Sequence, residues 1–141
     1  VIGTASAGKH DFLRELGADE VIDYRETDFT EAVKDVDVVL DTLGGETSVR
    51  SLRVLRPGGI VVSIIPVGSD EFGEEAERLG VRAVRMLLDA ARAGMQAIAE
   101  LVEQGKLRPE IAGTFPLADA AEAHALGETG RTTGKLVLTM D

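Results

Sequence analysis

The chain of 141 residues contains no cysteine and no tryptophan, and only 4% of its residues are aromatic. Without cysteine no disulfide can form. The two histidines, His10 and His124, stand far apart, with no second ligand at metal spacing, so we expect no zinc site within this chain. No apolar run approaches the length of a bilayer span, which argues against a membrane partner. These absences are compatible with a cytoplasmic protein, the localisation that we expect.

Positive charge is also scarce. The chain has 25 Asp and Glu against 15 Lys and Arg, a net charge of -10, and its basic residues are scattered rather than clustered in a stripe. Such a surface repels phosphate backbones, so nucleic acid is not an expected partner. Apolar residues make up 44% of the chain, enough for one ordinary core, or for one domain with an appended piece.

The segment 36–66 organises the chain as a strand, a helix and a second strand. Residues 36–43 are mostly aliphatic and precede two glycines, which is typical of a buried strand. Residues 46–56 have apolar positions at three-residue spacing and predict an amphipathic helix, stopped by Pro-Gly-Gly at 57–59. The apolar run 60–65 predicts a strand covered on both faces, as in parallel sheets. Ligands bind beyond the carboxyl ends of such strands, here residues 41–45 and 63–68.

Two short strands and two short helices are predicted before this unit. The first strand covers 1–6 and the first helix 9–16, and the second strand covers 20–24 and the second helix 29–33. Two residues are candidates for the N-cap of the second helix: Thr27 and Asp28.

The rest of the chain is less regular. The acidic segment 70–80 has little apolar surface, and we expect a loop with at most one helical turn. Segment 81–88 is either an exposed strand or the start of a helix. Residues 91–104 carry a stripe of Met and Ile that predicts a helix packed on a core. Further predicted elements are an extended segment 107–115, a helix from 116 through 126 capped by Asp119 and Glu122, and a strand 135–140.

Seven segments, taken in order, carry a family likeness: VIGTAS, FLRELGADEVIDYR, VDVVLDTLGGET, LRVLRPGGIVVSI, LVEQGKLRP, FPLADAAEAH and TGKLVL. Together they resemble the medium-chain dehydrogenase/reductase superfamily, zinc-type alcohol dehydrogenase-like, and most closely its quinone-oxidoreductase branch. The likeness covers nearly the whole chain. No GxGxxG motif occurs, and the sequence begins without Met directly in a strand-like run, so we expect a chain cut out of something longer.

The resemblance implies an α/β fold, an incomplete Rossmann-like doubly wound parallel sheet that lacks its first strand and glycine-rich loop. Residues 1–106 would be a partial dinucleotide-binding domain, and residues 107–141 a C-terminal segment that returns to the catalytic domain. The complete enzyme would transfer a hydride from NADPH to a quinone, enone or related small carbonyl substrate. No catalytic residue can be assigned, and we expect this chain alone to be inactive; a homo-oligomer stays open.

By resemblance, the positions near the 2′-phosphate of NADP are Thr4, Ser6, Lys9, Tyr24 and Arg25. Asp41 to Gly44 would line the adenine and ribose, Ser63 to Val67, with Pro66 between them, would face the nicotinamide, and Gly134 and Lys135 would approach from the tail. Each has a structural alternative: Ser6 and Gly8 form only a turn, Lys9 is solvated, and Asp41 caps the next element. His124 is interpreted as structural.

The end of the first strand favours NADP over NAD. NAD-selective Rossmann folds place an acid at this position to accept the ribose hydroxyls. Here the strand ends in Thr-Ala-Ser, with Lys9 next and Arg25 after the following strand, so hydroxyls and positive charge replace the acid. Asp11 and Asp23 argue against this interpretation, because either could turn toward the ribose.

Two further questions stay open at this point. A stand-alone nucleotide-binding or interaction module without catalysis is the alternative to an oxidoreductase.

In a Rossmann sheet the missing strand is the central one, so the strands at 1–5 and 37–41 would each have an unpaired inner edge. We expect either direct pairing of these strands, in the order 2-1-3-4-5, or insertion of a strand from elsewhere.

Overall fold

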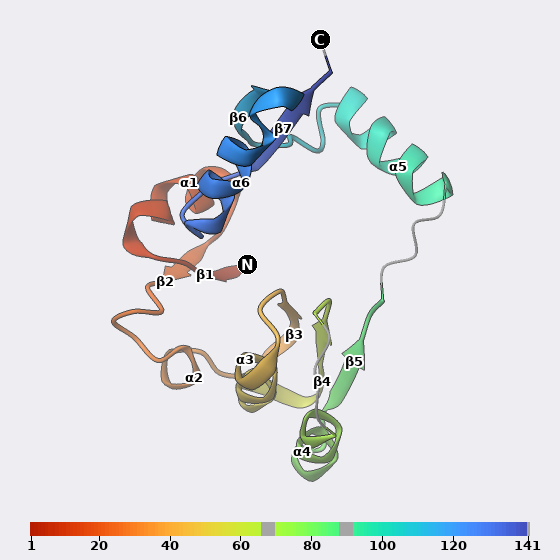
Figure 1. The fold of residues 1–141 in the computed structure, drawn as a ribbon. Helices are drawn as coiled ribbons and strands as arrows, with labels where there is room; N and C mark the ends of the chain where they lie inside the picture. Colours follow the sequence, from red (N-terminus) through yellow and green to blue (C-terminus); the bar gives the residue numbers. More distant parts are fainter. Residues whose placement is uncertain (66–69, 88–91, 141) are drawn as a thin grey trace. The chain divides into compact units, whose positions relative to one another are not determined.

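The structure, a computed structural model, describes residues 1–65, 70–87 and 92–140. The chain folds as an α/β protein with parallel strands, as predicted (Figure 1). It forms two compact units, residues 1–88 and residues 89–141. The predicted domain boundary at 106/107 concerns the complete protein and stays a prediction. Within the described ranges, no helix has both the length and the apolarity needed to cross a bilayer.

The first unit begins with a pair of parallel strands, β1 (Ile2–Thr4) and β2 (Glu20–Ile22). Between them lie a 3₁₀ turn, η1 (Ala7–Lys9), and helix α1 (His10–Glu15). Helix α2 (Phe29–Ala32) follows β2, and the Asp28 carboxylate caps it by accepting from the Thr30 amide at 2.9 Å. These elements match the predicted order, and Asp28 rather than Thr27 is the N-cap.

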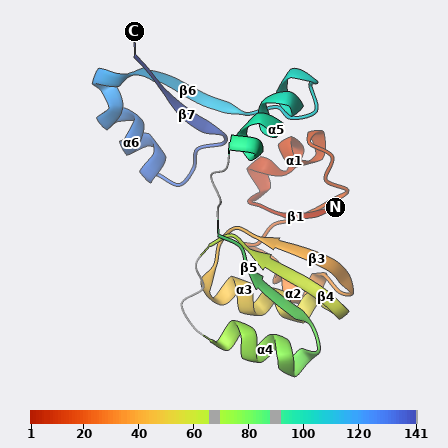
Figure 2. The ribbon, with the colours of Figure 1, turned by 90° about the vertical axis from the view of Figure 1, so that its right-hand side faces the viewer.

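The same unit continues with a three-stranded parallel sheet in the order β3-β4-β5. Its strands are β3 (Val36–Asp41), β4 (Leu55–Ser63) and β5 (Arg82–Arg85). Helix α3 (Gly45–Ser51) with the 3₁₀ turn η2 (Leu52–Val54) connects β3 to β4, and α4 (Glu71–Leu79) precedes β5. Figure 2 shows α3 and α4 together on one face of this sheet.

The core of this sheet lies between its strands and the two helices. Val49, Leu52, Val61, Phe72 and Ala76 are buried there as one cluster. The opposite face is less covered, since Val38 and Leu40 of β3 are 61% and 64% exposed. In residues 60–65, Val61 and Ser63 are buried, Ile60 and Val62 are half-buried, and Ile64 and Ile65 lie beyond the end of β4 and are exposed. The prediction of a strand covered on both faces is therefore correct for one face, and the other is half-covered.

Strand β4 begins earlier than predicted. Leu55 already pairs with Val36, and the ladder resumes at Ile60 opposite Val38, so the Pro-Gly-Gly segment forms an irregularity within the strand instead of separating helix from strand. Gly58 has a φ of 77°, which favours glycine. A Cβ on Gly59 would lie 3.0 Å from the Arg56 carbonyl oxygen. The two glycines therefore allow a bulge against β3.

The prediction of a loop over residues 70–80 is wrong. Helix α4 fills this segment, with Phe72 and Ala76 buried and Leu79 packed beside them. The spacing i, i+4, i+7 places these three side chains on one helical face, and Gly80, with a φ of 66°, ends the helix in the left-handed conformation. The acidic residues occupy the solvent side and hide this short stripe.

The strands β1 and β3 do not pair with each other in the described part of the chain, and no strand lies between them. Direct pairing of these strands is therefore wrong, whereas insertion of a strand from outside residues 1–141 stays a prediction. The reason is geometric: paired strands lie about 4.8 Å apart, whereas a hollow of about 800 Å³ lies between β1 and β3. Phe29 and Val33 of the α2 region and Val54 line this hollow, and Val33 and Val54 are buried in one cluster with Ile22.

The second unit contains helix α5 (Arg92–Glu103) and a parallel strand pair, β6 (Ile111–Pro116) and β7 (Lys135–Thr139). The 3₁₀ turn η3 (Leu117–Asp119) and helix α6 (Ala120–Glu128) connect the two strands. Every residue of α5 is exposed, so the expected burial of its apolar stripe is wrong here. Asp119 occupies the N-cap position of α6, as predicted, but its side chain makes no cap hydrogen bond.

Candidate functional site

The carboxyl ends of β1 and β2 form the first candidate site. The segments that leave these strands are joined by two hydrogen bonds. The Ala5 amide donates to the Ile22 carbonyl oxygen at 3.0 Å, and the Ala7 amide donates to the Asp23 carboxylate at 2.9 Å. These bonds bring the predicted residues of both segments to the same edge of the strand pair: Thr4, Ser6 and Lys9 from the first, Tyr24 and Arg25 from the second.

Asp23 connects the two segments. Its second carboxylate oxygen accepts the Arg25 amide at 3.0 Å. The hydrogen bond from the Arg25 amide is the largest cause that lowers the pKa of Asp23 below its ordinary value. Desolvation opposes it, and the Ala7 amide adds to the lowering. Both oxygens of Asp23 therefore serve the backbone of the site. Asp11, the other acid near this edge, pairs with Arg14 at 2.9 Å.

The side chains of this edge combine hydroxyls with positive charge. Lys9 is the last residue of η1, one residue before α1, and is half-buried. The Arg25 guanidinium lies over the Tyr24 ring, 5.8 Å from its centroid, and the tyrosine is 57% exposed. An exposed guanidinium on an aromatic platform and a lysine at a helix start are groups that bind phosphate.

The carboxyl ends of β3 and β4 form the second candidate site, which is closed rather than open. The Asp41 side chain, at the end of β3, is buried and accepts hydrogen bonds from its surroundings. The Ser63 hydroxyl, at the end of β4, donates to it at 2.8 Å, and the Ser48 hydroxyl of α3 donates to the same oxygen. The amides of Leu43 and Gly44 donate at 3.0 and 3.2 Å.

These bonds set the protonation state of Asp41. Burial is the largest influence and raises the pKa of its carboxyl, but the donors together outweigh it: the Ser48 hydroxyl first, then the Leu43 amide, Ser63 and the Gly44 amide. The net result is a pKa below the ordinary value, so the carboxylate is charged at neutral pH. A buried charge with all its bonds inside the protein fixes the turn between β3 and α3.

The remaining predicted residues have simpler positions. Gly44 is the N-cap of α3, with a φ of 77°. Pro66 and Val67, expected near the nicotinamide, lie outside the described residues. Gly134 and Lys135 belong to the second unit, where the Lys135 amide donates to the Glu110 carbonyl oxygen at 2.8 Å. A Cβ on Gly134 would lie 2.5 Å from that same oxygen, so this glycine allows β6 and β7 to approach.

One hollow touches both candidate sites of the first unit. It is lined by Thr4 at the end of β1, and by Asp41 and the two residues that follow it at the end of β3. The structure thus brings predicted residues from β1 and β3 to one concave surface. This hollow is not indicated by the sequence, which favours pairing of the two strands across it.

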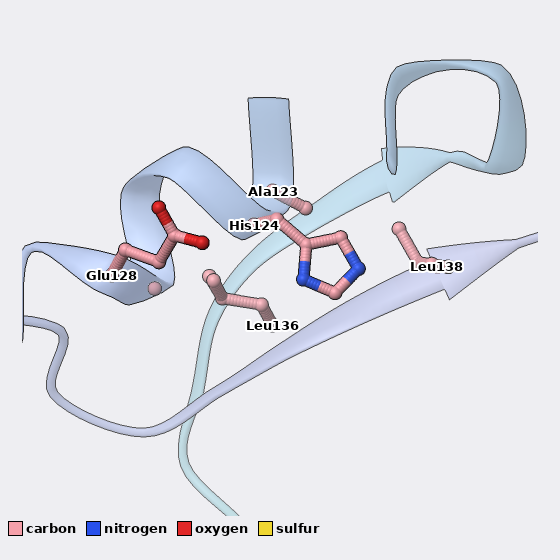
Figure 3. A pocket seen from close by; sticks show the side chains of 6 residues that line it. Ala123, His124, Glu128, Leu136 and Leu138 are labelled. Carbon is pink, nitrogen blue, oxygen red and sulfur yellow. The ribbon is translucent and has the colours of Figure 1, made fainter. Parts of the chain in front are cut away.

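A second hollow, of about 350 Å³, lies in the second unit (Figure 3). His124 and Glu128 border it from α6, and Leu136 and Leu138 border it from β7. His124 and Glu128 are four residues apart on the helix and thus share a face, a signal that was present in the sequence. Both are exposed, and the hollow holds no further charged residue among those that line it.

Comparison with known proteins decides the family. The family described as zinc-binding dehydrogenase matches residues 16–138. The chain belongs to this family. The resemblance to the medium-chain dehydrogenase/reductase superfamily is thereby confirmed.

Individual proteins also match nearly the whole chain. A quinone oxidoreductase structure from Coxiella burnetii is 37% identical with a TM-score of 0.91, over 100% of this chain and 45% of that one. A 2-haloacrylate reductase from Burkholderia sp. is 33% identical over 98% of this chain and 47% of its own length. The mouse NAD(P)H oxidoreductase RTN4IP1, mitochondrial, is 30% identical over 99% and 41%. The chain thus spans less than half the length of these relatives.

The family name raises the question of a zinc site. In the part of the chain that the structure describes, no three His, Asp or Glu side chains are grouped closely enough to hold a metal ion. The chain also has no cysteine. These residues do not fit a zinc ion, whose protein sites use three or four such ligands. That this chain binds no zinc stays a prediction.

Proposed function

We propose that this chain is the cofactor-binding part of an NADP-dependent oxidoreductase that passes a hydride to a quinone, an enone or a related carbonyl. Three matched proteins are named as NAD(P)H oxidoreductase, quinone oxidoreductase and 2-haloacrylate reductase, which supports this class of reaction. The nicotinamide would supply the hydride, and the protein would bind and orient it. The substrate, a cytoplasmic location and the absence of membrane or nucleic-acid partners belong to the same proposal.

The observation that carries the choice of NADP is the arrangement around Asp23. An acid at this edge would accept ribose hydroxyls and repel a 2′-phosphate. Both oxygens of Asp23 instead accept backbone amides, of Ala7 and Arg25. In this role the acid holds the segments that carry Lys9 and Arg25. The residues left to meet the adenosine ribose are thus hydroxyls and cations.

Each predicted residue then has a defined task. Ser6 and Thr4 would donate hydroxyl hydrogen bonds to phosphate oxygens, and Lys9 and Arg25 would supply positive charge. Tyr24 would hold the Arg25 guanidinium, whose planar donors suit phosphate. Asp41 would not contact the cofactor itself but would fix the turn over which the adenine and ribose would lie. Ser63 would support the same turn through its hydrogen bond to Asp41.

The test is the ratio of NADPH to NADH affinity in the polypeptide expressed from its own reading frame. Charge-assisted contacts to phosphate contribute roughly 1.5–3 kcal/mol each, so Lys9→Glu is expected to lower the preference for NADPH by about tenfold or more. Lys34→Glu makes the same charge change on the segment after α2 and is the matched control. It is expected to leave the ratio unchanged.

Two results would contradict the proposal. One is an intact protein that prefers NADH, and the other is an affinity ratio that Lys9→Glu and Lys34→Glu change equally. A separate measurement concerns the 141-residue chain alone, which we expect not to oxidise NADPH in the presence of a quinone or an enone. Steady NADPH oxidation by the purified chain would show that the catalytic machinery lies within it.

A further inference from the structure

The turn from Ser6 to Lys9 connects β1 to α1 and carries two of the residues that the proposed function places near the 2′-phosphate. The Lys9 amide donates to the Ser6 carbonyl oxygen at 2.9 Å, which closes the turn on itself. The Ala7 amide donates to the Asp23 carboxylate at 2.9 Å, which ties the turn to the segment after β2. The conformation of this turn therefore decides where the Ser6 hydroxyl and the Lys9 ammonium group lie.

A third hydrogen bond joins the two ends of this turn, and it comes from a histidine side chain. His10 is the first residue of α1 and is half-buried. Its Nε2 atom lies 3.1 Å from the carbonyl oxygen of Ala5. Because a carbonyl oxygen only accepts hydrogen bonds, Nε2 carries the hydrogen and donates it. The bond thus runs from the residue after the turn to the residue before it.

Ala5, the acceptor of this bond, directly follows β1 and is held on both sides. Its amide donates to the Ile22 carbonyl oxygen at 3.0 Å, and its own carbonyl oxygen accepts from His10. A peptide unit is planar, so a fixed Ala5 carbonyl also fixes the nitrogen of Ser6 in the same plane. The imidazole therefore sets the direction in which the chain leaves β1 toward Ser6.

The imidazole also lies close to Asp23, which holds the same turn from the side of β2. The Arg25 amide is the largest cause that lowers the pKa of Asp23. Desolvation opposes it, and the Ala7 amide and then the charge of His10 add to the lowering. His10 thus stands between the two groups that hold the turn, the Ala5 carbonyl and the Asp23 carboxylate.

We propose that His10 is a positioning residue for the 2′-phosphate of NADP, because its bond to the Ala5 carbonyl keeps Ser6 and Lys9 in the conformation that meets the phosphate. This role rests on the proposed function and adds to it a residue that acts through others. A turn that is already ordered loses less conformational entropy when a ligand binds. NADH has no 2′-phosphate for Ser6 and Lys9 to hold, so its affinity depends less on His10.

The experiment compares His10→Gln with His10→Asn in the polypeptide expressed from its own reading frame. Both side chains are polar and neutral, but only the longer glutamine places its NH2 group where the Nε2 atom of histidine lies. His124, the other histidine of the chain, lies on α6, and His124→Asn is the matched control. Two quantities are measured: the ratio of NADPH to NADH affinity, and the hydrogen exchange of backbone amides without cofactor.

His10→Asn is expected to lower the affinity ratio by about threefold to tenfold, the range that one hydrogen bond contributes. The amides of Ala7 and Lys9 are expected to exchange faster by a similar factor, whereas the amides of β4 keep their rate because the fold is intact. His10→Gln and His124→Asn are each expected to change the ratio and these rates by less than about twofold. A general loss of structure would instead weaken NADPH and NADH alike.

Three results would overturn the role of His10 alone. The first is unchanged exchange of the turn amides in His10→Asn, because then the bond does not hold the turn. The second is an unchanged affinity ratio in His10→Asn while Lys9→Glu lowers it. The third is an equal loss in His10→Gln and His10→Asn, which assigns the effect to the ring or its charge. If Lys9→Glu also leaves the ratio unchanged, the proposed function fails and the role of His10 fails with it.

Discussion

The first unit has two strand edges at which a ligand is expected, and they handle polar groups in opposite ways. At the end of β3 and β4, Asp41 is 4% exposed and Ser63 is 1% exposed, and they bond to each other. At the end of β1 and β2, the carboxylate of Asp23 accepts the amides of Ala7 and Arg25, and Tyr24 is 57% exposed beside Arg25. One edge is rigid and internally satisfied, and the other presents its side chains to solvent.

The comparison separates positioning from binding. A buried carboxylate with several internal donors is costly to disturb and has little capacity left for a ligand. Hydroxyls, a lysine and an arginine that are exposed or half-buried contribute little to stability but can form new charge-assisted bonds. The same kind of residue, an aspartate after a parallel strand, therefore serves the fold at Asp41 and the local loop geometry at Asp23.

The largest expected effect is on the core beneath the rigid edge. Phe72 is 1% exposed and packs with Leu52 and Val61, so Phe72→Ala is expected to lower the free energy of unfolding by about 3–5 kcal/mol. Tyr24→Ala removes an aromatic ring at the open edge and is expected to cost less than about 1 kcal/mol. Urea denaturation followed by circular dichroism measures both. Equal losses would contradict the contrast between the two edges.

Asp41→Asn is expected to have the next largest effect. The asparagine side chain has an NH2 group in place of one carboxylate oxygen, and this group cannot accept a hydrogen bond. The Ser48 hydroxyl or a turn amide therefore loses its buried acceptor. The expected cost is about 2–4 kcal/mol. Asp23→Asn, in a half-buried position, is the matched control, with an expected cost below about 1 kcal/mol. If Asp23→Asn costs as much, the open edge is as rigid as the closed one.

At acidic pH, the difference in free energy of unfolding between the unaltered chain and Asp41→Asn is expected to shrink. The pKa of Asp41 is lowered in the folded chain, so its contribution to stability is present above the unfolded pKa of about 3.9 and is lost as pH falls through the folded value. The gap in free energy of unfolding between the two proteins is expected to stay constant from pH 7 to pH 5 and to shrink below pH 4. A gap that is the same at pH 7 and pH 3 would show that Asp41 does not act through its charge.

The order of helices and strands could be predicted from the sequence, because aliphatic runs and three-residue spacing are local signals. The helix over 71–79 could not, since only Phe72, Ala76 and Leu79 form its apolar face among acids. The start of β4 at Leu55 also escaped prediction. Pro-Gly-Gly ordinarily ends an element, and only the pairing of Leu55 with Val36 shows that the strand continues through it.

The positions of the candidate site could be predicted from the sequence. That they form one edge with buried, internally bonded side chains and one edge with solvent-accessible side chains could not be predicted. Asp41 was expected near the cofactor with a structural alternative, and its role depends on Ser48 and Ser63, seven and twenty-two residues away. Asp23 was expected to argue against NADP, because its carboxylate could turn toward the ribose. Its bonds to the Ala7 and Arg25 amides depend on the packing of two strands. No local pattern reports such contacts, because they form only when the sheet assembles.

The smallest expected effects come from two glycine-to-alanine substitutions, one in β4 and one in the turn after β1. A Cβ on Gly59, in the bulge of β4, would lie 3.0 Å from the Arg56 carbonyl oxygen and 3.2 Å from that of Asp37, and backbone atoms cannot move aside easily. Gly59→Ala is therefore expected to cost about 1–2 kcal/mol. A Cβ on Gly8, in the turn after β1, would meet nothing within 4 Å. Gly8→Ala is expected to be neutral or to stabilise by up to about 1 kcal/mol, because it restricts the unfolded chain. Thermal and urea unfolding of the two variants decide the matter, and a larger loss for Gly8→Ala would mean that the open edge is packed more tightly than β4.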